Sequence, residues 1–272
     1  MVLKDLLKNK LTKKQLELVP NSFDIIGNRD KAVVIIEIPD KLKSKEKIIA
    51  NALMKQHKNV KAVLNKTAPR SGVYRTYKLR KIKGGSTEVI HTESGCRFLL
   101  DPRKVYFSQR ESNERIRISE KVKKETVMVF FAGVGPFAIL IAKKAKKVIG
   151  IEINPDAIKY FRKNIELNKL NNVSAVLGDV KKKASEYYGK CDRVLMPLPE
   201  TSDKYIREAV RCLKKGVIHF YCFSKEDKIS KQKTKIRAKA RQLKKRIKFI
   251  GINKVLPYGP GIWKYRIDIE VK

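Results

Sequence analysis

The pattern of apolar and polar positions divides the sequence into two parts. Up to about residue 110, apolar runs predict strands at residues 31–39 and 60–64, and apolar side chains at helical spacing predict a helix over 44–57. Residues 89–100 predict a hairpin around Ser94-Gly95, and residues 69–72 and 84–85 are interpreted as turns. This mixture predicts a small α+β domain over residues 1–110.

From about residue 111 the pattern changes to regular alternation of strands and helices. Strands are expected at residues 127–131, 148–151, 173–177, 193–196 and 217–223, and helices at 137–145, 155–168 and 202–213. Alternation of this kind predicts a parallel sheet in an open α/β fold. A basic helix over 225–248 and two strands at 249–256 and 264–271 follow, and their short connection predicts an antiparallel pair. The second domain therefore covers residues 111–272.

Charge changes the picture more than overall composition does. The 64 Lys and Arg residues exceed the 27 Asp and Glu residues, which gives a net charge of +37. Because neutralised phosphates release condensed counterions, an excess of this size favours a polyanionic partner such as RNA. A generally Lys-rich composition is the alternative cause, and it would have the same consequence for binding.

The spacing of the cysteines and the length of the apolar runs indicate the cellular location. The four cysteines follow no CxxC or Cys/His spacing, which is typical of reduced thiols rather than of metal ligands. Lysines interrupt every apolar run near residue 1, so we expect no signal peptide there. No stretch approaches the roughly 20 apolar residues that a membrane span needs. We therefore expect a cytoplasmic protein that binds neither a metal nor a membrane.

A glycine-containing loop follows the first strand of the second domain. Residues 131–137 read Phe-Ala-Gly-Val-Gly-Pro-Phe, between a strand and a helix, and Gly133 and Gly135 let the backbone approach a ligand closely. Glu152 lies 19 residues after Gly133, at the end of the next strand, where a carboxylate can hold the hydroxyls of an adenosine ribose. Pro136 removes an amide that a pyrophosphate would need. The loop therefore favours an adenosyl ligand without phosphates, and S-adenosylmethionine fits.

The next two strands also end in residues that fit this ligand. Asp179 could accept a hydrogen bond from the adenine amine with Val180 against the ring, and Pro197 should border the transferred methyl group. Each signal alone could be a tight turn, a surface acid or a rigid strand exit, but together they are harder to dismiss. The expected cofactor-binding residues are Phe131, Gly133, Gly135, Glu152, Ile153, Asp179, Val180 and Pro197. We predict a class I (Rossmann-like) methyltransferase domain preceded by a smaller α+β RNA-binding domain.

Longer motifs carry a family resemblance. Residues 90–98 read Ile-His-Thr-Glu-Ser-Gly-Cys-Arg-Phe, residues 104–108 read Lys-Val-Tyr-Phe-Ser, and Arg110, Glu114 and Arg115 follow. Together with the loop at 131–137, Glu152 to Pro155, Gly178-Asp179, Gly216 to His219 and Pro257 to Pro260, this series resembles the archaeal and eukaryotic tRNA (guanine-37-N1)-methyltransferase family. The resemblance covers nearly the whole chain.

The resemblance implies formation of 1-methylguanosine at the purine 3′ of the anticodon of a tRNA. It further implies that Arg115 contacts the cofactor and that the anticodon stem-loop is bound. Arg97 or Arg110 would stabilise the negative charge that develops toward O6 of the target base, although both arginines could instead bind tRNA phosphates. The proton on N1 must be accepted, and Asp101, Glu111 and Glu114 all remain open as the acceptor.

Two departures from the family pattern leave alternatives open. Val129 and Phe130 stand where an acid usually precedes the loop, and Pro197 stands in place of an asparagine. A related branch methylates a wyosine-type tricyclic guanosine or transfers an aminocarboxypropyl group to it, and Pro197 makes that wider substrate range, or a bifunctional enzyme, worth considering. A non-catalytic RNA-binding protein on a methyltransferase fold is the further alternative.

Overall fold

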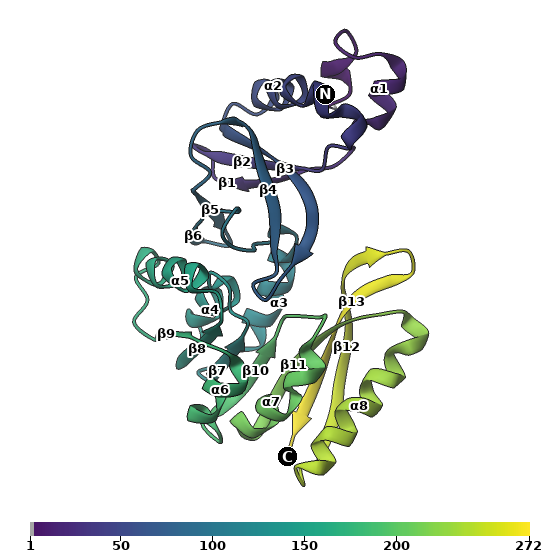
Figure 1. Ribbon diagram of the computed structural model, residues 1–272. Helices are drawn as coiled ribbons and strands as arrows, with labels where there is room; N and C mark the ends of the chain where they lie inside the picture. The colour runs from purple at the N-terminus through teal and green to yellow at the C-terminus, as the bar shows by residue number, and fades with distance from the viewer. Residues whose placement is uncertain (1–2) are drawn as a thin grey trace. The chain divides into compact units, whose positions relative to one another are not determined.

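The computed structural model describes residues 3–272. The chain divides into two compact units, with the division between Gln109 and Arg110. Figure 1 shows the helices and strands of each unit, which are described separately below.

The first unit is a four-stranded sheet covered by helices, with a separate hairpin. Strands β1 (Asp24–Gly27), β2 (Ala32–Ile36), β3 (Val60–Ser71) and β4 (Thr76–Gly84) are ordered β1-β2-β3-β4, and only the β2–β3 pair is parallel. Helix α2 (Glu46–Gln56) makes the crossover between these two strands, and α1 (Lys13–Leu18) precedes the sheet. The buried side chains include Leu7, Leu42, Ile49 and Leu53 from helical segments and Val34, Ile36 and Val63 from the sheet. The hairpin is β5 (Val89–Glu93) with β6 (Cys96–Leu100), as predicted.

The turn predicted at residues 69–72 is wrong in position. Strand β3 continues to Ser71 and forms a long antiparallel pair with β4, and the chain reverses at residues 72–75. Pro69 lies where the pairing is irregular, between Ala68 and Ser71, and proline is tolerated at such irregularities because it has no amide hydrogen to donate. The sequence suggested a break because proline and glycine lie close together there.

The second unit is an open α/β layer structure, which confirms the predicted fold class. Its seven strands are β7 (Thr126–Phe130), β8 (Lys147–Glu152), β9 (Val173–Leu177), β10 (Cys191–Met196), β11 (Leu213–Ser224), β12 (Ile247–Gly259) and β13 (Ile262–Val271). They are ordered β12-β13-β11-β10-β7-β8-β9. The five strands from β11 to β9 are parallel, and β13 pairs antiparallel with both of its neighbours.

The two faces of this sheet differ in chemistry. Side chains from α6 (Val180–Lys183), α7 (Ile206–Cys212) and α8 (Ile229–Gln242) share one apolar cluster with Ile218, Phe220, Ile267 and Ile269. Because side chains alternate along a strand, His219 and Tyr221 project to the opposite face. That face meets α3 (Ser112–Lys121) and α4 (Pro136–Ala142), and α5 (Pro155–Leu167) packs beside them on β8 and β9 (Figure 1).

The basic helix is shorter than predicted. Helix α8 ends at Gln242, Lys244 adopts a left-handed conformation with φ of 55°, and β12 begins at Ile247 by pairing with Val271. The pairing of a strand with a partner distant in sequence overrides the helical pattern there. No helix among residues 3–272 is long and apolar enough to span a membrane.

Candidate active site

The glycine loop between β7 and α4 adopts a conformation that needs glycine. Gly133 and Gly135 have φ of 56° and 88°, and Gly135 is the N-cap residue of α4. A Cβ atom on Gly135 would overlap the ring of Phe161 in α5. Phe131 also has a positive φ, and its ring lies 4.9 Å from that of Tyr205 in an edge-to-face contact. The positive φ angles and the packing against Phe161 of α5 therefore both determine the conformation of this loop.

Glu152 connects the loop to the next strand. It ends β8 with 8% of its surface exposed, and its Oε2 accepts a hydrogen bond of 2.8 Å from the amide of Gly133. Its Oε1 accepts another, also of 2.8 Å, from the amide of Asn154, whose own side chain caps α5. Burial raises the pKa of the Glu152 carboxyl, although the backbone hydrogen bonds oppose this shift. The carboxylate is thus held rigidly at the carboxyl end of its strand.

The remaining predicted cofactor residues follow β9 and β10. Asp179 is the N-cap of α6 and accepts a hydrogen bond of 2.8 Å from the amide of Lys181, while Val180 is buried. Pro197 directly follows β10. Strands β10, β7, β8 and β9 are adjacent and parallel, so their carboxyl ends meet at one edge of the sheet. The structure therefore brings the loop, Glu152, Asp179 and Pro197 to a common edge, where open α/β folds bind ligands.

The three predicted arginines lie in different settings. Arg97 is exposed on β6 of the first unit, and Arg110 is exposed at the start of the second. Arg115 is 2% exposed on α3. The roles of all three remain predictions.

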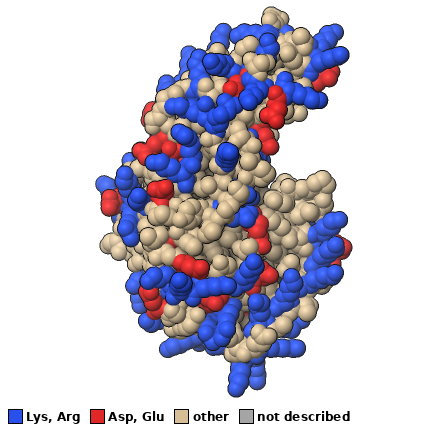
Figure 2. Space-filling view, viewed as in Figure 1, with Lys and Arg blue, Asp and Glu red and all other residues tan. Residues whose placement is uncertain are grey.

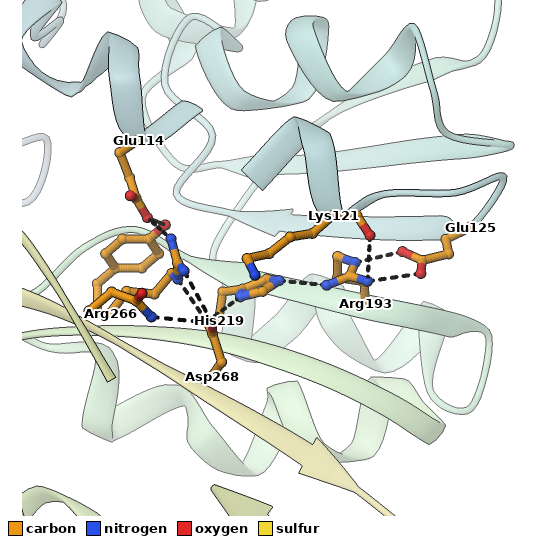
Figure 3. A network of polar contacts seen from close by, with 9 residues as sticks. Glu114, Lys121, Glu125, Arg193, His219, Arg266 and Asp268 are labelled. Atoms are coloured by element: carbon orange, nitrogen blue, oxygen red, sulfur yellow. Dashed lines mark hydrogen bonds and ion pairs between the residues drawn. The ribbon is translucent and has the colours of Figure 1, made fainter. Parts of the chain in front are cut away.

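A buried polar network crosses the second face of the sheet (Figure 3). Glu114 of α3 accepts on Oε1 from the Tyr221 hydroxyl at 2.7 Å and from Arg266 Nη1 at 2.6 Å. Arg266 also donates two hydrogen bonds to the carboxylate of Asp268, from Nε at 2.7 Å and from Nη2 at 3.1 Å. Burial alone would raise the pKa of Asp268, but hydrogen bonds from His219 and Arg266 lower it to about 2.

His219 extends the network to the other end of the sheet. A guanidinium has no acceptor, so Nε2 of His219 accepts from Arg193 Nη1 at 2.6 Å, and Nδ1–H donates to Asp268 at 2.6 Å. Arg193 in turn forms an ion pair with Glu125. Burial lowers the pKa of His219, and the adjacent guanidinium groups of Arg193 and Arg266 lower it further, against the opposing hydrogen bond to Asp268. The histidine is therefore a neutral structural bridge.

Comparisons with known proteins decide the family. A family model described as the TRM5/TYW2 methyltransferase domain matches residues 89–249. The chain belongs to this family. A second model, described as the TYW2 N-terminal domain, matches residues 3–87. The boundary between the two family models therefore precedes the β5–β6 hairpin, whereas in the structure this hairpin belongs to the first compact unit.

Individual relatives span most of the chain. It is 43% identical over 257 residues to "tRNA (guanine(37)-N(1))-methyltransferase Trm5b" of Pyrococcus abyssi, which covers 93% of this chain and 76% of the relative. It is 32% identical to "tRNA (guanine(37)-N(1))/4-demethylwyosine(37)-methyltransferase Taw22" of Nanoarchaeum equitans, over 92% and 99% of the two chains. The crystal structure of TYW2 from M. jannaschii in complex with AdoMet matches with a TM-score of 0.74 and 28% identity, over 92% and 99% of the two chains.

Sequence reasoning missed two side chains of this TRM5/TYW2 site. The single hydroxyl hydrogen of Ser202 is shared between the carbonyls of Met196 (3.0 Å) and Leu198 (2.6 Å), on either side of Pro197. Lys264 of β13 donates to the carbonyl of Pro197 itself at 3.2 Å. A lone serine and a lysine in a basic chain carry no motif, so no sequence signal could have identified them.

Proposed function

We propose that this protein is an S-adenosylmethionine-dependent tRNA methyltransferase that forms 1-methylguanosine at position 37. The observation that carries the proposal is the hydrogen bond from the Gly133 amide to Glu152, which builds an adenosyl-binding edge in a TRM5/TYW2 chain. The relative that is 43% identical bears the name of this activity. A tRNA substrate and four buried free thiols in the described chain fit a cytoplasmic location.

The residues at the sheet edge fit the cofactor in their chemistry. Glu152 supplies a rigid acceptor for ribose hydroxyls, and Asp179 supplies a carboxylate beside the buried Val180 for an adenine. Phe131, Ile153, Pro197 and Arg115 complete the proposed set. When bound, S-adenosylmethionine supplies an activated methyl group on its sulfonium. A relative of known structure was crystallised with AdoMet, which supports this assignment.

The contacts of the three candidate proton acceptors favour Glu114. Asp101 accepts from the Thr87 hydroxyl at 2.8 Å and from the Arg103 amide at 3.0 Å, which suits a structural turn. Glu111 Oε1 is held by Lys264 at 2.9 Å. Glu114 has one oxygen held by Tyr221 and Arg266. Its buried Oε2 lies 3.7 Å from Nη1 of Arg117 in an ion pair but accepts no hydrogen bond within the described chain.

We therefore assign Glu114 Oε2 to accept the proton from N1 of the target guanine. Removal of that proton leaves negative charge that spreads toward O6, and a guanidinium near O6 would stabilise the charge more in the transition state than in the ground state. Arg97 and Arg110 are the proposed sources of this guanidinium. Both side chains are exposed.

Charge supports tRNA binding over a wide surface. Lys and Arg side chains are spread over both units on the face drawn in Figure 2 and outnumber the acidic ones. Exposed side chains on α8, such as Lys231, Lys235 and Arg237, fit contacts to RNA phosphates rather than to bases. Flexible cationic side chains bind the phosphate backbone by charge and do not distinguish one base from another. Binding of the anticodon stem-loop should therefore weaken steeply with added salt.

The test is methyl transfer from labelled S-adenosylmethionine to two transcripts of one tRNA. The transcripts carry G or A 3′ of the anticodon and are otherwise identical, and the product is identified by nucleoside mass spectrometry. 1-Methylguanosine on the G transcript alone is the expected result. Measurable cofactor binding without product on either transcript would refute guanosine methylation, and absence of both would leave a non-catalytic RNA-binding protein.

Methylation of a wyosine-type base is the second candidate function. Two observations favour it: the TYW2 N-terminal model matches residues 3–87, and a relative covered over 99% of its length is named for both guanosine and 4-demethylwyosine. The same assay with tRNA that carries 4-demethylwyosine tests it. Methylation of both substrates would establish a bifunctional enzyme, and a heavier aminocarboxypropyl adduct would identify the other transferase activity.

A further inference from the structure

Lys264 is an ammonium buried at the carboxyl edge of the sheet. The residue is 4% exposed on β13, where it pairs with Phe223 of β11. Its Nζ donates to Glu111 Oε1 at 2.9 Å and to the carbonyl of Pro197 at 3.2 Å, and it lies 5.0 Å from the centre of the Tyr221 ring. A carboxylate, a carbonyl and an aromatic face thus surround the charge.

Burial of a charged group is costly unless partners replace its water. An ammonium has three donors and no acceptor, and here two of its donors are used in hydrogen bonds while the cation faces a π-system. Such an arrangement holds Lys264 in one position. It therefore holds its two partners in fixed positions as well.

The two partners belong to segments that carry the proposed chemistry. Glu111 immediately follows Arg110 and precedes the helix of Glu114 and Arg115. Pro197 begins the loop after β10 at the cofactor edge. The sequence separates Glu111 from Lys264 by 153 positions, so this contact is a true tertiary link between two parts of the site.

The loop after β10 is held at three successive carbonyl groups. Ser202 binds the carbonyls of Met196 and Leu198, and Lys264 binds the one between them. Proline has no amide hydrogen and no polar side chain, so its carbonyl oxygen is the only group through which Pro197 can be oriented by a hydrogen bond. Lys264 supplies that bond.

We propose that Lys264 is a positioning residue for methyl transfer, which fixes the loop after β10 against the segment of Arg110 and Glu111. The proposal rests on the methyltransferase function proposed above. Small misplacements of groups around the reacting atoms reduce the rate strongly, while binding that depends on many other contacts changes little. Loss of Lys264 should therefore lower kcat more than it weakens cofactor binding.

The experiment compares Lys264→Met with the natural protein. Methionine keeps the length of the side chain and removes its charge. At saturating tRNA and S-adenosylmethionine, and well below the unfolding temperature, we expect kcat to fall by about 10- to 100-fold. The dissociation constant for S-adenosylmethionine should change by less than about threefold. Lys264→Arg, which keeps the charge, should recover part of the rate.

Two further variants separate positioning from general effects. Lys254→Met removes the same charge from an exposed ion pair with Glu226 and should leave kcat unchanged. Glu111→Gln cuts the same link from the other side, at a partly exposed site, so it also tests the proposal if Lys264→Met fails to fold. Because both variants break one link, the double variant should lose little more activity than either single variant.

The possible failures can be distinguished. An active natural protein whose Lys264→Met and Glu111→Gln variants keep the full kcat would overturn the role of Lys264 but not the proposed function. Losses that multiply in the double variant would show that the residues act independently, which also overturns the proposal. A natural protein that methylates neither guanosine nor 4-demethylwyosine would overturn both proposals together.

Discussion

Replacement of Glu152 by glutamine tests the proposed cofactor edge most directly. The carboxylate accepts amide hydrogens on both oxygens, from Gly133 on Oε2 and from Asn154 on Oε1. A glutamine of the same size presents one oxygen and one NH2 group. Whichever way it turns, its NH2 group faces an amide N–H, so one hydrogen bond to the carboxylate is lost and two donors oppose each other.

The size of the effect follows from the kind of hydrogen bond. A hydrogen bond to a charged group contributes about 1.5–3 kcal/mol, and a ribose hydroxyl bound to the carboxylate would be weakened as well. If a hydrogen bond of this strength between the ribose and Glu152 is lost, the dissociation constant for S-adenosylmethionine rises about 10- to 100-fold. The Gly133 loop should also become less rigid.

The pH dependence of S-adenosylmethionine binding is a second, independent test of Glu152. Burial raises the pKa of Glu152 above the ordinary value of 4.5. Ribose hydroxyls donate to the ionised form, so as the pH falls through the raised pKa the carboxyl must lose a proton before it can bind. The affinity of the natural protein should therefore decrease toward acid, by up to about tenfold per pH unit, whereas glutamine has no such titration.

Isothermal titration calorimetry over a range of pH measures both quantities. Glu186→Gln is the matched control, because it neutralises an exposed carboxylate that forms an ion pair with Lys183 and should leave binding unchanged. The reasoning fails if Glu152→Gln binds S-adenosylmethionine within twofold of the natural protein, or if both proteins show the same pH dependence.

Two further predictions concern stability. His219 is buried with a lowered pKa, so below its ordinary value of 6.5 the unfolded chain binds a proton that the folded chain does not. Denaturant unfolding should show a free energy of unfolding that decreases by up to about 1.4 kcal/mol for each pH unit below 6.5. If this pH dependence is not reduced in His219→Asn, the linkage is contradicted. Gly135→Ala should cost about 1–2 kcal/mol for its positive φ and about 1–3 kcal/mol more for overlap with Phe161. Gly261→Ala, at φ of 69° with no described atom within 4 Å of the new Cβ, should cost only the first amount, and equal shifts in thermal unfolding would refute the packing argument.

The local patterns predicted the second unit well because its strands and helices alternate regularly. The loop at residues 131–137 and the acid at the end of the following strand could be recognised by spacing alone, and the structure joins them through Gly133 and Glu152. By contrast, the end of β3 is set by its pairing with β4 across the reversal at residues 72–75, and the end of α8 is set by the pairing of Ile247 with Val271. Local composition there pointed to a turn and to a longer helix.

The buried network lay beyond sequence reasoning for a different reason. Lys264, Arg266 and Asp268 alternate with apolar residues along β13, which is the usual pattern of a strand with one solvated face. Only the packing of α3 over that face shows that these charges are buried and paired. The proposal of Glu114 as the proton acceptor depends on the same packing, since only the structure shows that Oε1 is hydrogen-bonded and Oε2 is not.

The place of β13 in chain order bears on how the protein is made. The first unit is completed by residue 109 and can fold as soon as it leaves the ribosome. The second cannot, because β13 lies between β11 and β12 in the sheet but is synthesised after both. Until residues 262–271 emerge, Glu114 lacks its ion pair with Arg266 and His219 lacks its hydrogen bond to Asp268, so α3 would cover polar groups that are only partly satisfied. A nascent chain stalled before residue 262 should therefore carry a folded first unit and a second unit that is still open to proteases.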